Sequence, residues 1–172
     1  MRALVVLAAA AAACAPAPRP GVGLLPADGR LYDRDSSAFI AAERYKGKVV
    51  VLDFWAGWCG ECKRTVPQVR RLADAFAADG LVVVGVNAGE RAADVATYAR
   101  DLGIDYPIAL DPDLELSDRL GAGTLPALLV VDRDGTIVHR SKHVDAATLE
   151  AIRTLLRDRR PARPVATSSA QP

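Results

Sequence analysis

The chain has 172 residues, the length of one ordinary domain with short appendages. Hydrophobic residues make up 51% of it and charged residues 25%, which is typical of a soluble globular protein with one core. The formal net charge of +1 excludes a global field that would favour nucleic acid or an anionic membrane surface. The basic residues near the C-terminus are interpreted as a solvated helix end running into a tail, rather than as a binding patch; they are Arg157, Arg159, Arg160 and Arg163.

The N-terminus has the pattern of a secretory signal. Met1 and Arg2 precede an unbroken run of small apolar residues over 3–13, which is too short to span a bilayer, since about 20 residues are needed. A Pro-rich stretch over 15–21 then prevents a helix from continuing. We therefore predict a signal peptide over 1–13 and a mature domain outside the cytoplasm, where disulfides persist.

Ala11-Ala12-Ala13-Cys14 resembles the lipobox of bacterial lipoproteins, although Ala11 stands where Leu is preferred. The resemblance implies that Cys14 is lipidated and becomes the mature N-terminus, with residues 14–28 as a lipidated, flexible linker to a bacterial membrane. The alternative is an ordinary cleaved signal in which Cys14 has no role.

From residue 29 onward, strand-like and helix-like segments alternate. In chain order they are a helix over 36–44, a strand over 49–54, a helix over 59–79, a strand over 81–86, a helix over 91–102, a strand over 106–110, a helix over 114–120, strands over 127–131 and 136–140, and a helix over 145–157. This order predicts an α/β fold, a central mixed β-sheet with helices on both faces, in one domain over 29–158. Residues 159–172 are predicted to be a disordered tail.

Cys59-Gly60-Glu61-Cys62 lies between a buried strand and a long helix. The first cysteine falls at a helix N-terminus, where free N–H groups and the helix dipole stabilise a thiolate. The second cysteine lies one turn deeper. Cys59 is therefore the expected nucleophile on a substrate disulfide, and Cys62 is expected to resolve the mixed disulfide.

Three ordered stretches carry a family resemblance over roughly residues 29–157: 53–63 (DFWAGWCGECK), 86–90 (VNAGE) with 106–111 (YPIALD), and 123–132 (GTLPALLVVD). They resemble the thioredoxin family and, within it, the extracytoplasmic TlpA/ResA branch, and Pro67 fits the same family. The resemblance implies a thioredoxin fold and an enzyme, a thiol–disulfide oxidoreductase, without cofactor or metal.

The resemblance also implies roles for residues outside the cysteine motif. Thr124, Leu125 and Pro126 would form the cis-proline loop that faces the cysteines and pairs with substrate; a trans proline that starts a strand is the alternative. Asp53 would accept the proton of Cys62, because a carboxyl in an apolar strand has a raised pKa. The alternative for Asp53 is a purely structural buried acid.

Several residues around the cysteine motif differ from the family pattern or add to it. Gly85 stands where a lysine often partners the buried acid, and Glu61 stands where proline is usual. The charge of Glu61 is expected to disfavour the Cys59 thiolate and make the cysteine pair more reducing. The alternative is that Glu61 is a surface residue without effect on the cysteines. Trp58, with Gly60 and Glu61, is expected at an exposed substrate rim. Trp55 could lie at the rim or in the core, and we favour the core. Glu90 follows the second strand, and in some members of the family that the chain resembles an acid lies near the active-site cavity, but we favour the interpretation of Glu90 as a solvated loop residue.

Two alternatives to a reductase remain. A disulfide-donating oxidase would use the same site. A metal site could combine Cys59 and Cys62 with His139 and His143, but 76 residues separate Cys62 from His139, so this is disfavoured. As a reductase, the protein would need a membrane electron donor, and the resemblance implies clients such as apocytochrome c or copper-site cysteines. No nucleic-acid partner is expected.

Overall fold

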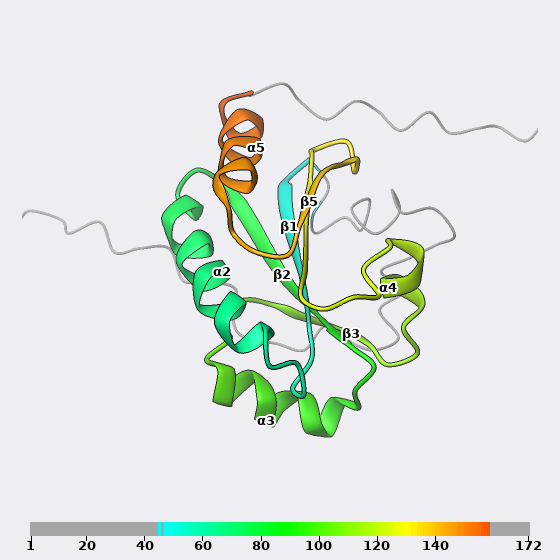
Figure 1. Ribbon diagram of the computed structural model, residues 1–172. Helices are drawn as coiled ribbons and strands as arrows, with labels where there is room; N and C mark the ends of the chain where they lie inside the picture. Colours follow the sequence, from blue (N-terminus) through cyan, green and yellow to red (C-terminus); the bar gives the residue numbers. More distant parts are fainter. Residues whose placement is uncertain (1–44, 46, 159–172) are drawn as a thin grey trace, which may run out of the picture.

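The computed structural model describes residue 45 and residues 47–158. Its centre is a five-stranded mixed sheet in the order β3-β2-β1-β4-β5 (Figure 1). The strands are β1 (Val49–Trp55), β2 (Leu81–Ala88), β3 (Ile108–Asp111), β4 (Ala127–Val131) and β5 (Ile137–Ser141). β1 runs parallel to β2 and antiparallel to β4, while β2 is parallel to β3 and β4 is antiparallel to β5. The described part of the chain thus has the predicted thioredoxin-like α/β fold.

The helices cover both faces of the sheet. They are α2 (Cys62–Phe76), α3 (Ala92–Leu102), α4 (Glu115–Arg119) and α5 (Ala146–Arg157). Buried residues of α2, α3 and α5 belong to one core cluster, whereas Leu116 of α4 belongs to a second cluster on the other face. Figure 1 accordingly shows α4 apart from the other three helices.

β1 explains why there are two cores. All seven of its residues are buried, and successive side chains of a strand point to opposite faces. Val49, Val51 and Trp55 pack in the first cluster with α2, while the residues between them, such as Leu52 and Phe54, pack in the second. Asp53 stands two residues from both Val51 and Trp55 on β1. Its side chain therefore lies on the same face of the sheet as theirs, the face that α2 covers.

The predicted helix over 59–79 is too long at both ends. Residues 59–61 form a turn, in which the N–H of Cys62 donates to the carbonyl of Cys59, and α2 begins only at Cys62. At the other end, Asp79 and Gly80 donate to carbonyls three residues back, as in a tight turn, so the helix ends at Phe76. Helix ends commonly tighten in this way because their terminal groups lack partners four residues away.

Two strands are displaced from their predicted ranges. Asp132 Oδ1 accepts the N–H groups of Asp134 and Thr136, which keeps Thr136 in the turn and starts β5 at Ile137. The strand predicted over 106–110 is observed over 108–111, because Pro107 has no N–H to give to a neighbouring strand. The predicted helix over 36–44, Cys14, the segments 1–13 and 14–28, and the tail 159–172 lie outside the described residues.

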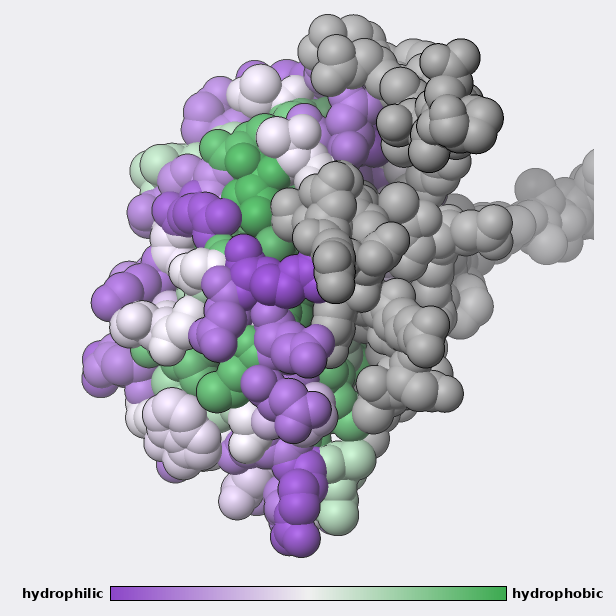
Figure 2. Space-filling model, turned by 90° about the vertical axis from the view of Figure 1, so that its right-hand side faces the viewer, coloured by the Kyte–Doolittle hydropathy of each residue, from purple (hydrophilic) through white to green (hydrophobic). Residues whose placement is uncertain are grey.

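Within the described residues, no helix combines the length and apolar character needed to cross a membrane. Figure 2 views the domain from the side of β5 and α4, where hydrophilic side chains alternate with apolar residues that reach the surface.

Candidate active site

The two cysteines of the motif form a disulfide immediately before α2. Their sulfurs are 2.07 Å apart and their Cα atoms 5.3 Å apart. The backbone N–H of Cys62 also donates to Cys59 Sγ at 3.1 Å, so the first N–H of the helix points at the sulfur that we predict to be the nucleophile. Cys62 is fully buried and Cys59 is 5% exposed, so Cys59 is the sulfur that an incoming substrate reaches. This geometry is suited to thiol–disulfide exchange.

The peptide bond between Leu125 and Pro126 is cis, as the family resemblance implies. Pro126 directly precedes β4, whose first residue, Ala127, pairs with Phe54 near the end of β1. The cysteine loop leaves that same end of β1, and Leu125 packs against the core cluster that contains both cysteines. The cis-proline segment therefore lies beside the cysteine loop, at the end of the sheet where β1 finishes and β4 begins. Thr124 is exposed there.

Asp53 is 1% exposed and lies on the α2 side of β1. The hydroxyl of Tyr106 donates to Asp53 Oδ2 at 2.5 Å, and Oδ1 has no hydrogen-bond partner among the described residues. Burial raises the pKa of Asp53 from 3.8 to about 6, and the hydrogen bond from Tyr106 lowers it only in part. Burial, together with the charge of Asp53, holds the pKa of Tyr106 well above its usual range, so Tyr106 keeps its proton and acts as the donor.

The rim around the disulfide is partly apolar. Trp58 is 71% exposed and Gly60 is also exposed, with nothing within 4 Å of where a Cβ would stand. Trp55, by contrast, is completely buried in the core, as predicted. An exposed indole next to Cys59 offers a flat apolar surface for a client chain.

Glu61 is paired with a neighbouring cation. Its carboxylate forms an ion pair with Arg64 three residues later, and both side chains are at least half exposed. Glu61 makes no side-chain cap to the N-terminus of α2. Its charge therefore acts on Cys59 only through solvent and against the opposing charge of Arg64.

The interpretation of Glu90 as a solvated loop residue is wrong. Its Oε2 accepts the N–H of Gly57 at 2.9 Å and the amide of the buried Asn87 at 2.6 Å. Gly57 is also covered by the ring of Tyr98, which a Cβ at this position would approach to 2.3 Å. Glu90 and Tyr98 thus fix the backbone two residues before Cys59. The sequence carried one signal: Glu90 follows the end of β2, and neighbouring parallel strands end at the same edge of a sheet.

The alternative metal site is not assembled. His139 lies on β5 at the edge of the sheet, where its Nε2 is 3.2 Å from Thr148 Oγ1. The cysteines lie instead beyond the end of the central strand β1. Across residue 45 and residues 47–158, no group of three or more His, Cys, Asp or Glu side chains could hold a metal ion.

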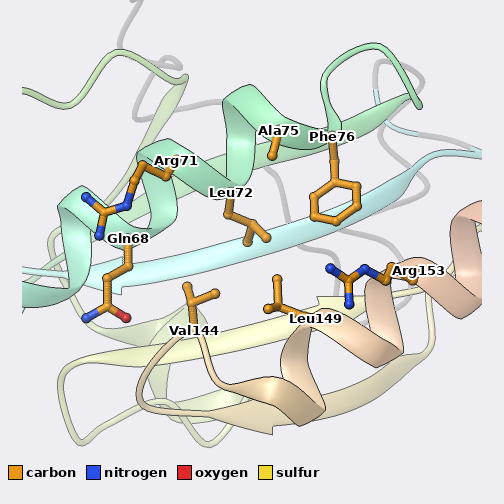
Figure 3. Close-up of a pocket in the computed structure, with 8 residues that line it drawn as sticks. All are labelled: Gln68, Arg71, Leu72, Ala75, Phe76, Val144, Leu149 and Arg153. Carbon is orange, nitrogen blue, oxygen red and sulfur yellow. The ribbon is translucent and has the colours of Figure 1, made fainter.

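A groove of about 400 Å³ opens between α2 and α5, separate from the cysteines (Figure 3). Leu72 and Phe76 of α2 face Leu149 of α5 across it, and the guanidinium of Arg153 lies over the ring of Phe76 at 6.0 Å. None of the residues predicted for the site lines this groove, so it is not part of the candidate active site.

A disulfide at the start of α2, a neighbouring cis-proline and a buried acid behind the motif, held in a thioredoxin-like sheet, define a domain of the thiol–disulfide oxidoreductase class. Comparison with known proteins places it more closely. The model of the Redoxin family matches residues 21–156, and the chain belongs to that family.

The chain is also similar to individual curated proteins and solved structures. The thiol–disulfide oxidoreductase ResA of Geobacillus thermodenitrificans is 32% identical over 93 residues, which cover 54% of this chain and 53% of ResA. The protein DipZ of Mycobacterium tuberculosis is 37% identical over 123 residues, 67% of this chain but 18% of DipZ. The crystal structure of StoA from Bacillus subtilis superposes with a TM-score of 0.54 at 27% identity, covering 62% of this chain and 82% of StoA. The chain spans about half the length of the ResA proteins that it matches.

Proposed function

We propose that this protein is an extracytoplasmic thiol–disulfide oxidoreductase that reduces disulfides in exported client proteins. The observation that carries the proposal is the Cys59–Cys62 disulfide, with Cys59 at the helix N-terminus and next to the cis-proline segment. The similarity to ResA proteins supports the reaction class. The signal-like segment 1–13 and the lipobox-like Cys14 support export and a lipid anchor to a bacterial membrane.

In the proposed reaction, the Cys59 thiolate attacks one sulfur of a client disulfide and forms a mixed disulfide. Cys62 then attacks Cys59, which releases the client as a dithiol and leaves the Cys59–Cys62 disulfide. The client gains two electrons and the protein loses two, so a membrane donor of reducing equivalents must restore the dithiol. Clients of the apocytochrome c or copper-site type fit, because their function requires reduced cysteine pairs outside the cytoplasm.

The direct test is capture of the mixed disulfide. In Cys62→Ser, Cys59 can attack a disulfide, but no second cysteine can resolve the mixed disulfide. This variant should therefore form a stoichiometric adduct with a peptide whose disulfide joins two cysteines separated by two residues. The adduct should be cleaved by dithiothreitol. Cys59→Ser, the matched control, keeps Cys62 of the motif but lacks the nucleophile and should form none. If Cys62→Ser captures no more peptide than Cys59→Ser, the exchange mechanism is wrong.

The reduction potential decides the direction. A value near that of thioredoxin, about −270 mV, is expected for a reductase. A value near that of DsbA, about −120 mV, would instead make the protein a disulfide-donating oxidase that uses the same two cysteines.

A further inference from the structure

Tyr106 brings a phenol hydroxyl to the acid behind the cysteines from a segment 53 residues away. Its oxygen is 2.5 Å from Asp53 Oδ2, and Tyr106 is 4% exposed. The backbone directly after Tyr106 is fixed, because the carbonyl of Pro107 accepts the N–H of Gly85 on β2 at 2.8 Å. The contact is therefore built into the sheet and does not depend on a mobile surface side chain.

Gly85 creates the space that this contact requires. It pairs with Asp53 in the β1–β2 register, and a Cβ there would lie 2.9 Å from Trp55 Nε1 and 3.1 Å from Tyr106 Cε2. The indole and the phenol thus occupy the volume into which a side chain at position 85 would extend. A neutral hydroxyl, rather than a lysine ammonium from position 85, is consequently the partner of the buried acid.

The two oxygens of Asp53 are not equivalent. Oδ2 is occupied by Tyr106, while Oδ1 is buried without a hydrogen-bond partner among the described residues. Asp53 lies on the face of β1 whose core cluster includes Cys62. A buried carboxylate oxygen without a donor has its lone pairs available for a proton.

We propose that Tyr106 is a positioning residue for the exchange reaction, which holds Asp53 by Oδ2 and leaves Oδ1 as the oxygen that takes the proton of Cys62. This role rests on the function proposed above. The Cys62 thiol gives its proton to Asp53, and the Cys62 thiolate attacks Cys59 of the mixed disulfide. One S–S bond forms as another breaks, the client sulfur leaves as a thiolate, and Asp53 later returns the proton to solvent.

The contact also sets the pH at which this step works. A neutral donor stabilises the carboxylate by one hydrogen bond, without the attraction of a full positive charge. Asp53 then retains enough proton affinity to accept a proton from Cys62 near neutrality, consistent with a pKa of about 6. Removing the hydroxyl should raise this pKa further, because the charged form loses its donor.

The experiment compares Tyr106→Phe with Ser117→Ala, since each removes one buried hydroxyl that donates to a buried aspartate. Ser117 donates to Asp111 at 2.7 Å, away from the cysteines, and so serves as the matched control. Two quantities are measured in each protein: the titration of the Asp53 carboxyl by carbon-13 NMR, and the pH profile of single-turnover reduction of the disulfide peptide.

In Tyr106→Phe, both inflections should move upward by about one to two pH units, the effect of one hydrogen bond to a charged group. Ser117→Ala should leave both unmoved, and in an Asp53→Asn background Tyr106→Phe should shift no rate inflection. An unmoved carboxyl titration in Tyr106→Phe would overturn the role of Tyr106, as would a moved titration with an unchanged rate profile. Because the titration needs no turnover, it is read separately from the proposed function, which fails if the wild-type protein reduces no peptide at any pH.

Discussion

Two aspartates of this domain are equally hidden from solvent and differ in what their oxygens bond. Asp53, in the middle of β1, is 1% exposed, and Asp111, at the end of β3, is 0% exposed. Asp111 accepts three hydrogen bonds: Oδ1 from the N–H of Leu116, and Oδ2 from the N–H and the hydroxyl of Ser117. Asp53 accepts one, from Tyr106.

The difference shows that the number of donors, rather than burial alone, decides how well the charge of a buried acid is compensated. The donors around Asp111 replace its lost water and tie the start of α4 to the sheet. Asp53 receives too little compensation, and its charged form is costly. This cost falls on the residue for which we propose the role of proton acceptor. The two aspartates should respond in opposite ways to the same substitution.

The largest expected effect is a gain in stability when Asp53 becomes neutral. The folded-state pKa of about 6 lies above the ordinary 3.8, so the folded state holds more protons than the unfolded state between these values. Stability of the wild-type protein therefore falls as the pH rises from about 4 to 6. Asp53→Asn, which cannot ionise, should raise the free energy of unfolding at pH 7 by up to about 3 kcal/mol and by little at pH 4.

Urea unfolding of the oxidised proteins at the two pH values measures this difference directly. A gain of equal size at pH 4 and pH 7 would show that Asn packs better for reasons unrelated to charge. A loss at pH 7 would remove the contrast with Asp111.

Asp111→Asn should act in the opposite direction. Both oxygens of Asp111 accept backbone N–H groups. In either orientation of the asparagine amide, its NH₂ would therefore face one of these N–H groups, which would lose its acceptor. The expected loss is about 2 kcal/mol at pH 7, the cost of breaking a hydrogen bond to a charged group. Reduction of the disulfide peptide should be unaffected once the protein is folded, and a slower reduction by folded Asp111→Asn would contradict a purely structural role.

The sequence distinguished these two acids only in part. Val49–Phe54 is a run of apolar residues interrupted by one acid, and that pattern predicted both a buried strand and a raised pKa for Asp53. The number of donors was not predictable, because Tyr106 reaches Asp53 across 53 residues and no local pattern encodes such a contact. The three-donor cap on Asp111 was likewise missed, since it depends on the turn between β3 and α4.

The same limit applies to the rest of the site. The cysteine pair follows from a local motif, the cis-proline was implied by the family resemblance, and the core was favoured for Trp55. The structure has the Cys59–Cys62 disulfide, a cis bond before Pro126 and a buried Trp55. Glu90 was misassigned because a charged residue after a strand is usually solvated. Its hydrogen bond from Gly57 arises only when β2 lies beside β1 and brings the two residues together, whereas its hydrogen bond from Asn87 is local.

The smallest expected effect concerns a third carboxylate, Glu61, which is exposed to solvent where Asp53 and Asp111 are buried. Because Glu61 is half exposed and paired with Arg64, water and an opposing charge already compensate it. Glu61→Gln removes a charge that disfavours the Cys59 thiolate, so the reduction potential of the pair should become less negative by about 10–20 mV. Arg64→Gln leaves Glu61 uncompensated and should shift the potential in the negative direction. Equilibration with glutathione buffers measures both shifts, and a change of the same sign in both variants would mean that local helix structure, rather than charge, controls the potential.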